Sequence, residues 1–405
     1  MVGLVEVTMG RPWVVFLLCA FAGFFLTAAN TAHSPTLTLI MKDLNLNYTE
    51  GGLLTTAYFV GYALGQIPWG YLADRFKTGK VIALSTLGAS IFTLLFGGAT
   101  QGLEAILWRF LMGLLGAGIF VPGVRMVSDW FPSEKRGTAI GFFGAASSLG
   151  PIFSAPISSL IAAAYGWRWS IWFFMVLGLP SFFLSWTLLK EREESKLNRG
   201  ESFKDDRGML EQKSFWILGF DQFVRLGAIY ALLFWLPTFL LETYGIDRFW
   251  SSLSVVAMNT VGIFSNAVGG LISDRIGEKA VIISSLTALI PAFYLLAALK
   301  DQIAVWTLVI IFGWFLNFVR GPIFAILPKL YGVQRAGRAS GYQNTFAATG
   351  ALALPFILGY TRDYTASFDV GWMSLTLFCG AASIVTTFLR GSENSIEKEK
   401  GRRSH

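Results

Sequence analysis

The sequence predicts an all-α membrane protein with twelve transmembrane helices, arranged as two six-helix bundles related by pseudo-two-fold symmetry. Hydrophobic residues make up 54% of the 405 residues and charged residues 14%, whereas a soluble domain carries about a quarter charged residues. Twelve apolar stretches are each long enough, at about 20 residues, to cross the hydrocarbon core as a helix. Several motifs in the first half also recur about 200 residues later, which indicates an internal duplication.

The apolar stretches form two sets of six with one long polar stretch between them. We expect helices at approximately 13–36, 51–72, 80–99, 104–126, 138–162 and 169–189, and then at 214–240, 250–272, 280–299, 303–327, 339–360 and 371–389. The predicted domains are therefore an N-terminal bundle, a cytoplasmic linker, a C-terminal bundle and a charged cytoplasmic tail, at 1–189, 190–213, 214–390 and 391–405.

The duplication is clearest in a polar motif that joins the second and third stretches of each set. Gly70, Asp74 and Arg75 recur as Gly270, Asp274 and Arg275. Other glycines repeat at the same offset: Gly113 with Gly313, Gly141 with Gly341, and Gly150 with Gly350.

The placement of basic residues predicts the orientation. With both termini in the cytoplasm, 24 Lys and Arg residues fall on the inner side and five fall on outer loops. This bias satisfies the positive-inside rule and explains the net charge of +7 without a nucleic-acid partner. We expect a multi-pass protein of the cell membrane that acts as a monomer.

The doubled motif closely resembles that of the major facilitator superfamily of secondary transporters, and the resemblance covers nearly the whole chain. It implies the fold of that superfamily and transport by alternating access, and it names no substrate. It also implies a gating role for the repeated motif residues, with Asp74 latching the two bundles on the cytoplasmic side and Arg125 joining it. The alternative is that these charges only anchor a tight turn.

Two further resemblances point in different directions. Residues 130–137 (WFPSEKRG) look like the inner loop of organic-anion carriers of the superfamily. Gly150 and Pro151 resemble the motif named for drug antiporters, although the surrounding residues depart from it.

Ionisable residues inside spanning helices are functional candidates because burying an unpaired charge is costly. Arg109 and Gly113 match the fourth-helix motif of the superfamily, and this resemblance implies that Arg109 faces the central cavity. The alternative role for Arg109 is structural, with its guanidinium bonded to backbone carbonyls.

Asp221 and Arg225 lie four residues apart on the seventh stretch, so they share a helical face and can form an ion pair. Arg225 falls near the bilayer midplane, where transporters bind substrate. We expect Arg225 to anchor a carboxylate substrate and Asp221 to couple transport to protons, because a substrate that takes the arginine frees the aspartate to accept a proton. The alternative is a permanent structural ion pair.

Neutral polar side chains complete the predicted substrate site. These candidates are Asn30, Tyr58, Tyr62, Tyr230, Asn259 and Asn344. The roles of His33 and of Arg320 stay open at this level, with Arg320 either lining an inner vestibule or extending to the interface.

The sequence contains no phosphate-binding loop, no metal-ligand cluster and no nucleophile elbow, so we predict no enzymatic activity, no cofactor and no metal. The favoured function is a proton-coupled symporter or an exchanger for a small organic anion, because two arginines oppose one aspartate in the predicted cavity. The alternatives are an exporter of amphipathic compounds and a receptor that binds a solute without moving it.

Overall fold

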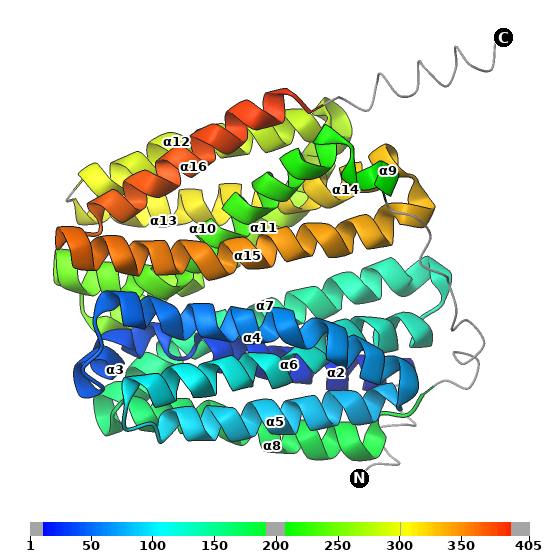
Figure 1. Cartoon of the computed structure of the whole chain (residues 1–405), viewed down its shortest axis with the longest axis horizontal. Coiled ribbons are helices and arrows are strands. Elements are labelled where there is room, and N and C mark those ends of the chain that lie inside the picture. The colour runs from blue at the N-terminus through cyan, green and yellow to red at the C-terminus, as the bar shows by residue number, and fades with distance from the viewer. Residues whose placement is uncertain (1–10, 192–206, 300, 390–405) are drawn as a thin grey trace. The chain divides into compact units, whose positions relative to one another are not determined.

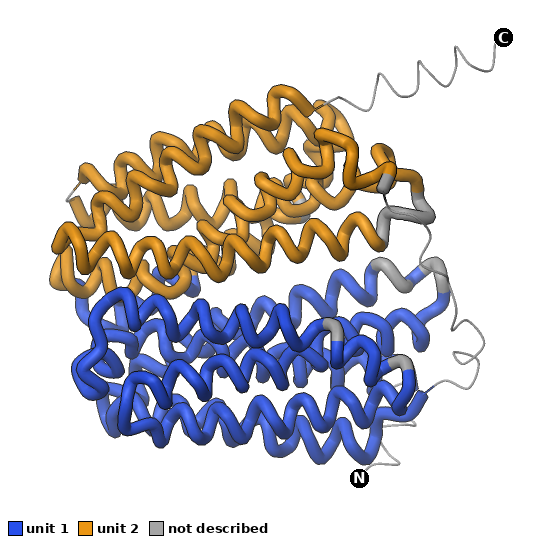
Figure 2. The backbone as a smooth tube through the Cα atoms, viewed as in Figure 1, with its two compact units in different colours: residues 1–202, 246–256 blue, residues 203–245, 257–405 orange. Residues whose placement is uncertain are grey.

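The computed structural model describes residues 11–191, 207–299 and 301–389 (Figure 1). Every regular element in these ranges is a helix, which confirms the predicted all-α class. The chain forms two compact units, residues 1–202 with 246–256, and residues 203–245 with 257–405 (Figure 2). Most of the predicted linker and all of the predicted tail lie outside the described residues.

The first unit contains the helices of the first predicted set. They are α2 (Arg11–Thr31), the short η1 (Ser34–Thr36) and α3 (Leu37–Asp43), then α4 (Tyr48–Arg75), α5 (Thr78–Gly97), α6 (Gly102–Trp130), α7 (Ser133–Tyr165) and α8 (Trp167–Leu188). The start of α4 follows from a capping box, in which Asn47 Oδ1 accepts from the Glu50 amide at 2.8 Å and Glu50 Oε2 accepts from the Asn47 amide at 2.9 Å.

The second unit contains the helices of the second set. They are α9 (Arg207–Leu210), α10 (Lys213–Tyr244), α11 (Arg248–Ile276), α12 (Glu278–Ala298), α13 (Gln302–Phe318), α14 (Arg320–Tyr331), α15 (Val333–Thr365) and α16 (Asp369–Thr387). In the described part of the chain, ten stretches are long and apolar enough to span a membrane, with α2–α3 and α13–α14 each taken as one stretch. The helices α4 and α15, of 28 and 33 residues, occupy the positions of the second and eleventh predicted spans.

Helix packing repeats between the two units. In the first unit α2 packs on α7 and α5 packs on α8, and in the second α10 packs on α15 and α12 packs on α16. In both units, one pair joins the first and fifth helices of the set of six, and the other pair joins the third and sixth. The duplication that the sequence predicts therefore extends to the packing of helices within each unit.

Two of the repeated glycine pairs lie at helix crossings, and the first of these pairs is Gly113 with Gly313. A Cβ placed on Gly113 would meet the Tyr58 carbonyl oxygen at 2.0 Å, and one on Gly313 would meet the Met258 carbonyl oxygen at 2.5 Å. Both separations are far below van der Waals contact, so only glycine lets these backbones approach so closely.

The crossing of the first and fifth helices of each unit depends on a second glycine pair. A Cβ on Gly150 would lie 2.1 Å from Thr27 Oγ1, and one on Gly350 would lie 1.9 Å from the Phe223 carbonyl oxygen. Gly350 is followed by alanine, so the packing role of this glycine does not depend on a following proline.

Lysines at the start of α5 and α12 bind the end of the last helix in their own unit. Lys80 Nζ donates to the Trp186 carbonyl at 2.9 Å, and Lys279 Nζ donates to the Thr387 carbonyl at 2.7 Å. A cation at a helix C-terminus satisfies a free carbonyl and interacts favourably with the helix dipole.

Residues 246–256 group with the first unit through Arg248. Its Nη1 donates to the Pro35 carbonyl at 2.9 Å and to Thr38 Oγ1 at 3.0 Å. The helix α11 thus begins among residues of the first unit and continues in the second.

We expect Gly113→Ala and Gly350→Ala to destabilise the protein by about 1–3 kcal/mol, because each added methyl group would meet backbone that cannot move aside. The measurement is thermal unfolding of the purified protein in detergent. Gly141→Ala and Gly341→Ala are matched controls, since a Cβ at either position has no atom within 4 Å. Equal unfolding temperatures for the two pairs would contradict the crossing role.

Candidate functional site

Arg109 lies on α6 in the interior of the first unit and is fully buried. Its Nη2 donates to Asn30 Oδ1 at 2.7 Å, and its Nε donates to the Leu54 carbonyl at 3.1 Å. The guanidinium carbon lies 4.9 Å from the centre of the Tyr58 ring, within the range of a cation–π interaction. Three helices therefore hold one cation with neutral partners, and no carboxylate pairs with it among the described residues.

The neighbours of Arg109 include most of the polar residues that the sequence singles out on this unit. Tyr58 and Tyr62 stack with ring centres 6.0 Å apart, one turn from each other on α4. His33 is fully buried, and its Nδ1 lies 2.9 Å from the Asn30 carbonyl oxygen. His33 thus belongs to the same buried cluster, and its role stays open.

Asp221 lies on α10 in the second unit and is fully buried. Its two carboxylate oxygens accept from Thr386 Oγ1 on α16, at 2.9 and 3.0 Å. No ion pair joins Asp221 to Arg225 in the part of the chain that the structure describes. The two residues share a helix, as predicted, but the partner of the carboxylate comes from the last helix.

Arg225 is 5% exposed and bonds to its own helix instead. Its Nε donates to Gln222 Oε1 at 2.8 Å, one turn earlier on α10. Arg320, at the start of α14, and Tyr230 on α10 are both close enough to Arg225 to interact with it electrostatically. Arg320 also interacts with Tyr230.

Two further predicted substrate residues of the second unit lie on other helices than Arg225. Asn259 is half-buried on α11, and Asn344 is exposed on α15. Arg109 and Arg225 belong to different units, so their common cavity stays a prediction.

The residues of the repeated motif lie at the ends of α4 and α11. The side chain of Asp74 lies outside the described residues. Asp274 and Arg275 are exposed, and Arg75 lies over the Tyr71 ring at 4.5 Å. A Cβ on Gly70 or on Gly270 would meet no atom within 4 Å, so neither glycine serves a close backbone approach. Arg125 is half-buried on α6, and the gating role of all these residues stays a prediction.

Sequence reasoning missed two residues of the second unit. Gln222 lies three residues before Arg225, a spacing that places both on one helical face and that could have identified it. Thr386 lies 165 residues after Asp221, and no local pattern in the sequence connects them.

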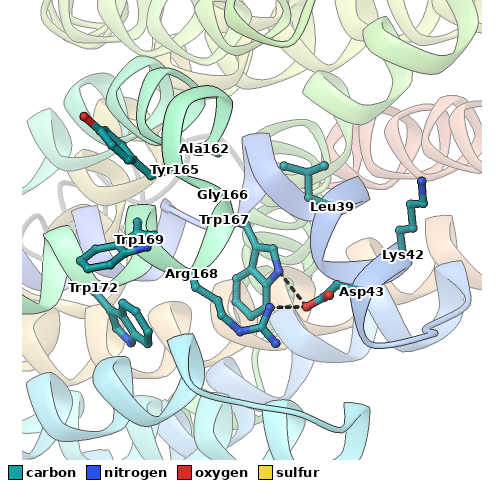
Figure 3. Close-up of a pocket in the computed structure, with 10 residues that line it drawn as sticks. All are labelled: Leu39, Lys42, Asp43, Ala162, Tyr165, Gly166, Trp167, Arg168, Trp169 and Trp172. Carbon is teal, nitrogen blue, oxygen red and sulfur yellow. Dashed lines mark hydrogen bonds and ion pairs between the residues drawn. The ribbon is translucent and has the colours of Figure 1, made fainter.

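A separate open pocket of about 660 Å³ lies at one end of the first unit, between α3, α7 and α8 (Figure 3). Asp43 accepts from Trp167 Nε1 at 3.1 Å and forms an ion pair with Arg168, while Trp169 and Trp172 line the opposite side. Tryptophans at helix ends are typical of membrane interfaces. None of the predicted substrate residues lines this pocket.

Long apolar helices in duplicated bundles, with guanidinium and carboxylate groups in their interiors, define a multi-pass membrane protein of the transporter class. The profile of the Major Facilitator Superfamily matches residues 19–355, and the chain belongs to that family.

Among curated proteins, the chain is 27% identical to the "Probable galactarate/D-glucarate transporter GudP" of Bacillus subtilis, over 93% of this chain and 90% of that protein. It is 26% identical to the "Probable sulfoacetate transporter SauU" of Cupriavidus necator, over 87% of each chain. Among solved structures, a bacterial homolog to the human lysosomal transporter Spinster, in an inward-facing and occupied conformation, has a TM-score of 0.76 at 15% identity. That match covers 93% of this chain and 96% of the other, and it supports the fold.

We expect Asn30→Leu to destabilise the protein by roughly 1.5–3 kcal/mol, because it removes a hydrogen bond to a buried charged group. Asn30→Asp has nearly the same shape and keeps an acceptor oxygen for Arg109, so it should unfold at a temperature close to that of the wild type. Thermal unfolding in detergent measures both. Equal losses in the two variants would mean that the Asn30 amide does not stabilise the arginine.

Proposed function

We propose that this protein is a secondary active transporter that moves a small organic anion by alternating access, coupled to protons or to a counter-substrate. The observation that carries this proposal is the state of two buried arginines. Arg109 and Arg225 each lie inside a helical unit, and neither has a carboxylate partner among the described residues. A buried cation without a counter-charge is costly, and an anionic substrate supplies that counter-charge.

The names of the relatives support an anionic substrate. GudP and SauU are named for the transport of galactarate or D-glucarate and of sulfoacetate, which are organic acids. The chain aligns with each of them over most of its length, so the comparison includes both arginines' helices. We therefore favour an organic acid over a cationic or neutral amphipathic compound.

Asp221 is our candidate for proton coupling. Intramembrane carboxylates often form part of proton relays, and this one is bonded to a hydroxyl group and, within the described ranges, to no cation. A threonine hydroxyl can donate to a carboxylate or accept from a carboxylic acid, so Thr386 can stay bonded to Asp221 in both protonation states. Coupling then depends on Asp221 and Thr386 together, without a direct competition for Arg225.

The orientation that we propose follows the bias of basic residues. Both termini would lie in the cytoplasm of a cell whose plasma membrane the helices cross, and the protein would act as a monomer.

The direct test is counterflow in proteoliposomes with labelled organic acids, phosphate esters and cationic dyes. We expect uptake of at least one organic acid, with a loss of about tenfold or more in Arg225→Lys, because lysine cannot reproduce the planar donor geometry of arginine. Arg362→Lys, in an arginine that is ion-paired to Glu242, is the matched control and should transport normally. Dye transport that is unaffected by Arg225→Lys, with no uptake of any acid, would overturn the proposal.

The test of coupling is the pH dependence of net uptake. If protons enter with the anion, lowering the external pH should increase uptake by the wild type. Asp221→Asn should abolish this dependence and leave exchange of internal for external substrate intact, since asparagine cannot bind a proton. Asp301→Asn is the control, because Asp301 is an exposed helix cap and asparagine also caps helices. A pH-dependent uptake that persists in Asp221→Asn would rule out this role for Asp221.

A further inference from the structure

The second unit gathers hydrogen-bond donors for which it provides no acceptor. The two terminal nitrogens of Arg225 have no hydrogen-bond partner among the described residues, and the same holds for the guanidinium of Arg320. The Nε2 donor of Gln222 is buried and also lacks a partner. Gln222 Oε1 accepts from Arg225 Nε at 2.8 Å, which leaves its amide as one more free donor next to the guanidinium.

The nearby carboxylate does not serve this cluster. Asp221 precedes Gln222 in the chain, but both of its oxygens bind Thr386. Arg225 and Arg320 therefore interact as two like charges, and the phenol of Tyr230 also interacts electrostatically with both. Unpartnered donors and like charges in a buried region form a site that an anion would stabilise.

Arg320 follows a one-residue gap between two helices, where Val319 keeps right-handed helical backbone angles. The tenth predicted span consists of α13, which ends at Phe318, and α14, which begins at Arg320. Pro322 cannot donate the backbone hydrogen bond that would join the two helices, and Gly321 adds backbone freedom. At the corresponding place in the first unit, Pro122 follows Val121 and α6 continues without a break.

The junction of α13 and α14 is closely packed against α11. A Cβ on Gly269 of α11 would lie 2.1 Å from the Phe318 carbonyl oxygen, so α11 contacts the end of α13 directly. Arg320 lies two residues after this close contact.

We propose that Arg225, Gln222 and Arg320 form one anion-binding site in the second unit, which selects small organic molecules with two negative charges. This inference rests on the proposed function and adds the charge class of the substrate. Two guanidinium groups carry two positive charges, so a dianion neutralises them whereas a monoanion leaves one charge uncompensated. Each guanidinium can also bind one carboxylate or sulfonate through two parallel hydrogen bonds.

The test compares dianions with monoanions of nearly the same shape. Purified wild-type protein is titrated with galactarate and galactonate, and with sulfoacetate and acetate, while binding is followed by calorimetry and thermal shift. We expect at least one dianion to bind more tightly than its matched monoanion. Arg320→Gln should weaken binding of that dianion roughly 10- to 100-fold, as expected for lost hydrogen bonds between charged groups, and should change binding of the monoanion less than threefold.

Two further variants separate binding from folding. Gln222→Glu introduces a carboxylate next to Arg225, which should abolish dianion binding without lowering the unfolding temperature, since the new group pairs with the arginine. Arg362→Gln removes the same charge from an arginine that is already paired with Glu242, and it should bind like the wild type.

The possible failures are distinguishable. If monoanions bind the wild type and no dianion does, or if Arg320→Gln weakens both classes equally, the inference about charge class is wrong and the proposed transport of anions stands. If no anion of the panel binds the wild type, both proposals fail.

Discussion

A guanidinium group inside a helical bundle must find acceptors for its five donors, because the hydrocarbon around it offers none. In the first unit this constraint brings three helices together. Asn30 of α2 and the Leu54 carbonyl of α4 accept from Arg109 of α6, and the aromatic ring of Tyr58 lies against its face. These polar and aromatic groups of the first unit are organised around Arg109. In the second unit the same requirement is only partly met, and we assign the unmet part to the substrate.

The two units share their helix crossings and differ in their polar interiors. Gly113 and Gly313 mark the same crossing, with carbonyl oxygens of the neighbouring helix at 2.0 and 2.5 Å from a Cβ placed there. Four residues before them stand Arg109 and Val309, both fully buried. The buried position four residues before this glycine therefore holds a charged side chain in the first unit and an aliphatic side chain in the second. Such asymmetry allows one unit to hold a stabilised cation while the other presents a cation that still lacks a counter-charge.

The helices and their crossings were predictable because the sequence patterns that indicate them are local or periodic. Apolar length predicts each span, and the offset of 200 residues identified glycines that the structure places at equivalent crossings.

The hydrogen-bond partners of the buried charged residues were harder to predict from the sequence. Asp221 and Arg225 have the spacing of an ion pair on one helix, and yet each bonds elsewhere, because Thr386 approaches from a helix 165 residues away. The spacing of residues along a helix shows which side chains can bond to each other, whereas packing between helices determines which bonds form. The electrostatic interaction between Arg320 and Arg225 joins residues of α14 and α10 that lie far apart in the chain, and no local pattern in the sequence connects them.

Thr386 is the second-to-last residue of α16, so the partner of Asp221 comes from the final turn of the last helix. Terminal turns open more readily than helix interiors because fewer hydrogen bonds hold them. In this chain that turn is secured from outside, by Lys279 of α12 binding the Thr387 carbonyl. If Asp221 couples transport to protons as we propose, a fluorescent reporter or purification tag joined close behind α16 would alter that coupling without touching the arginines of the proposed substrate site. A spacer long enough to leave this turn undisturbed is advisable in any fusion used to measure flux.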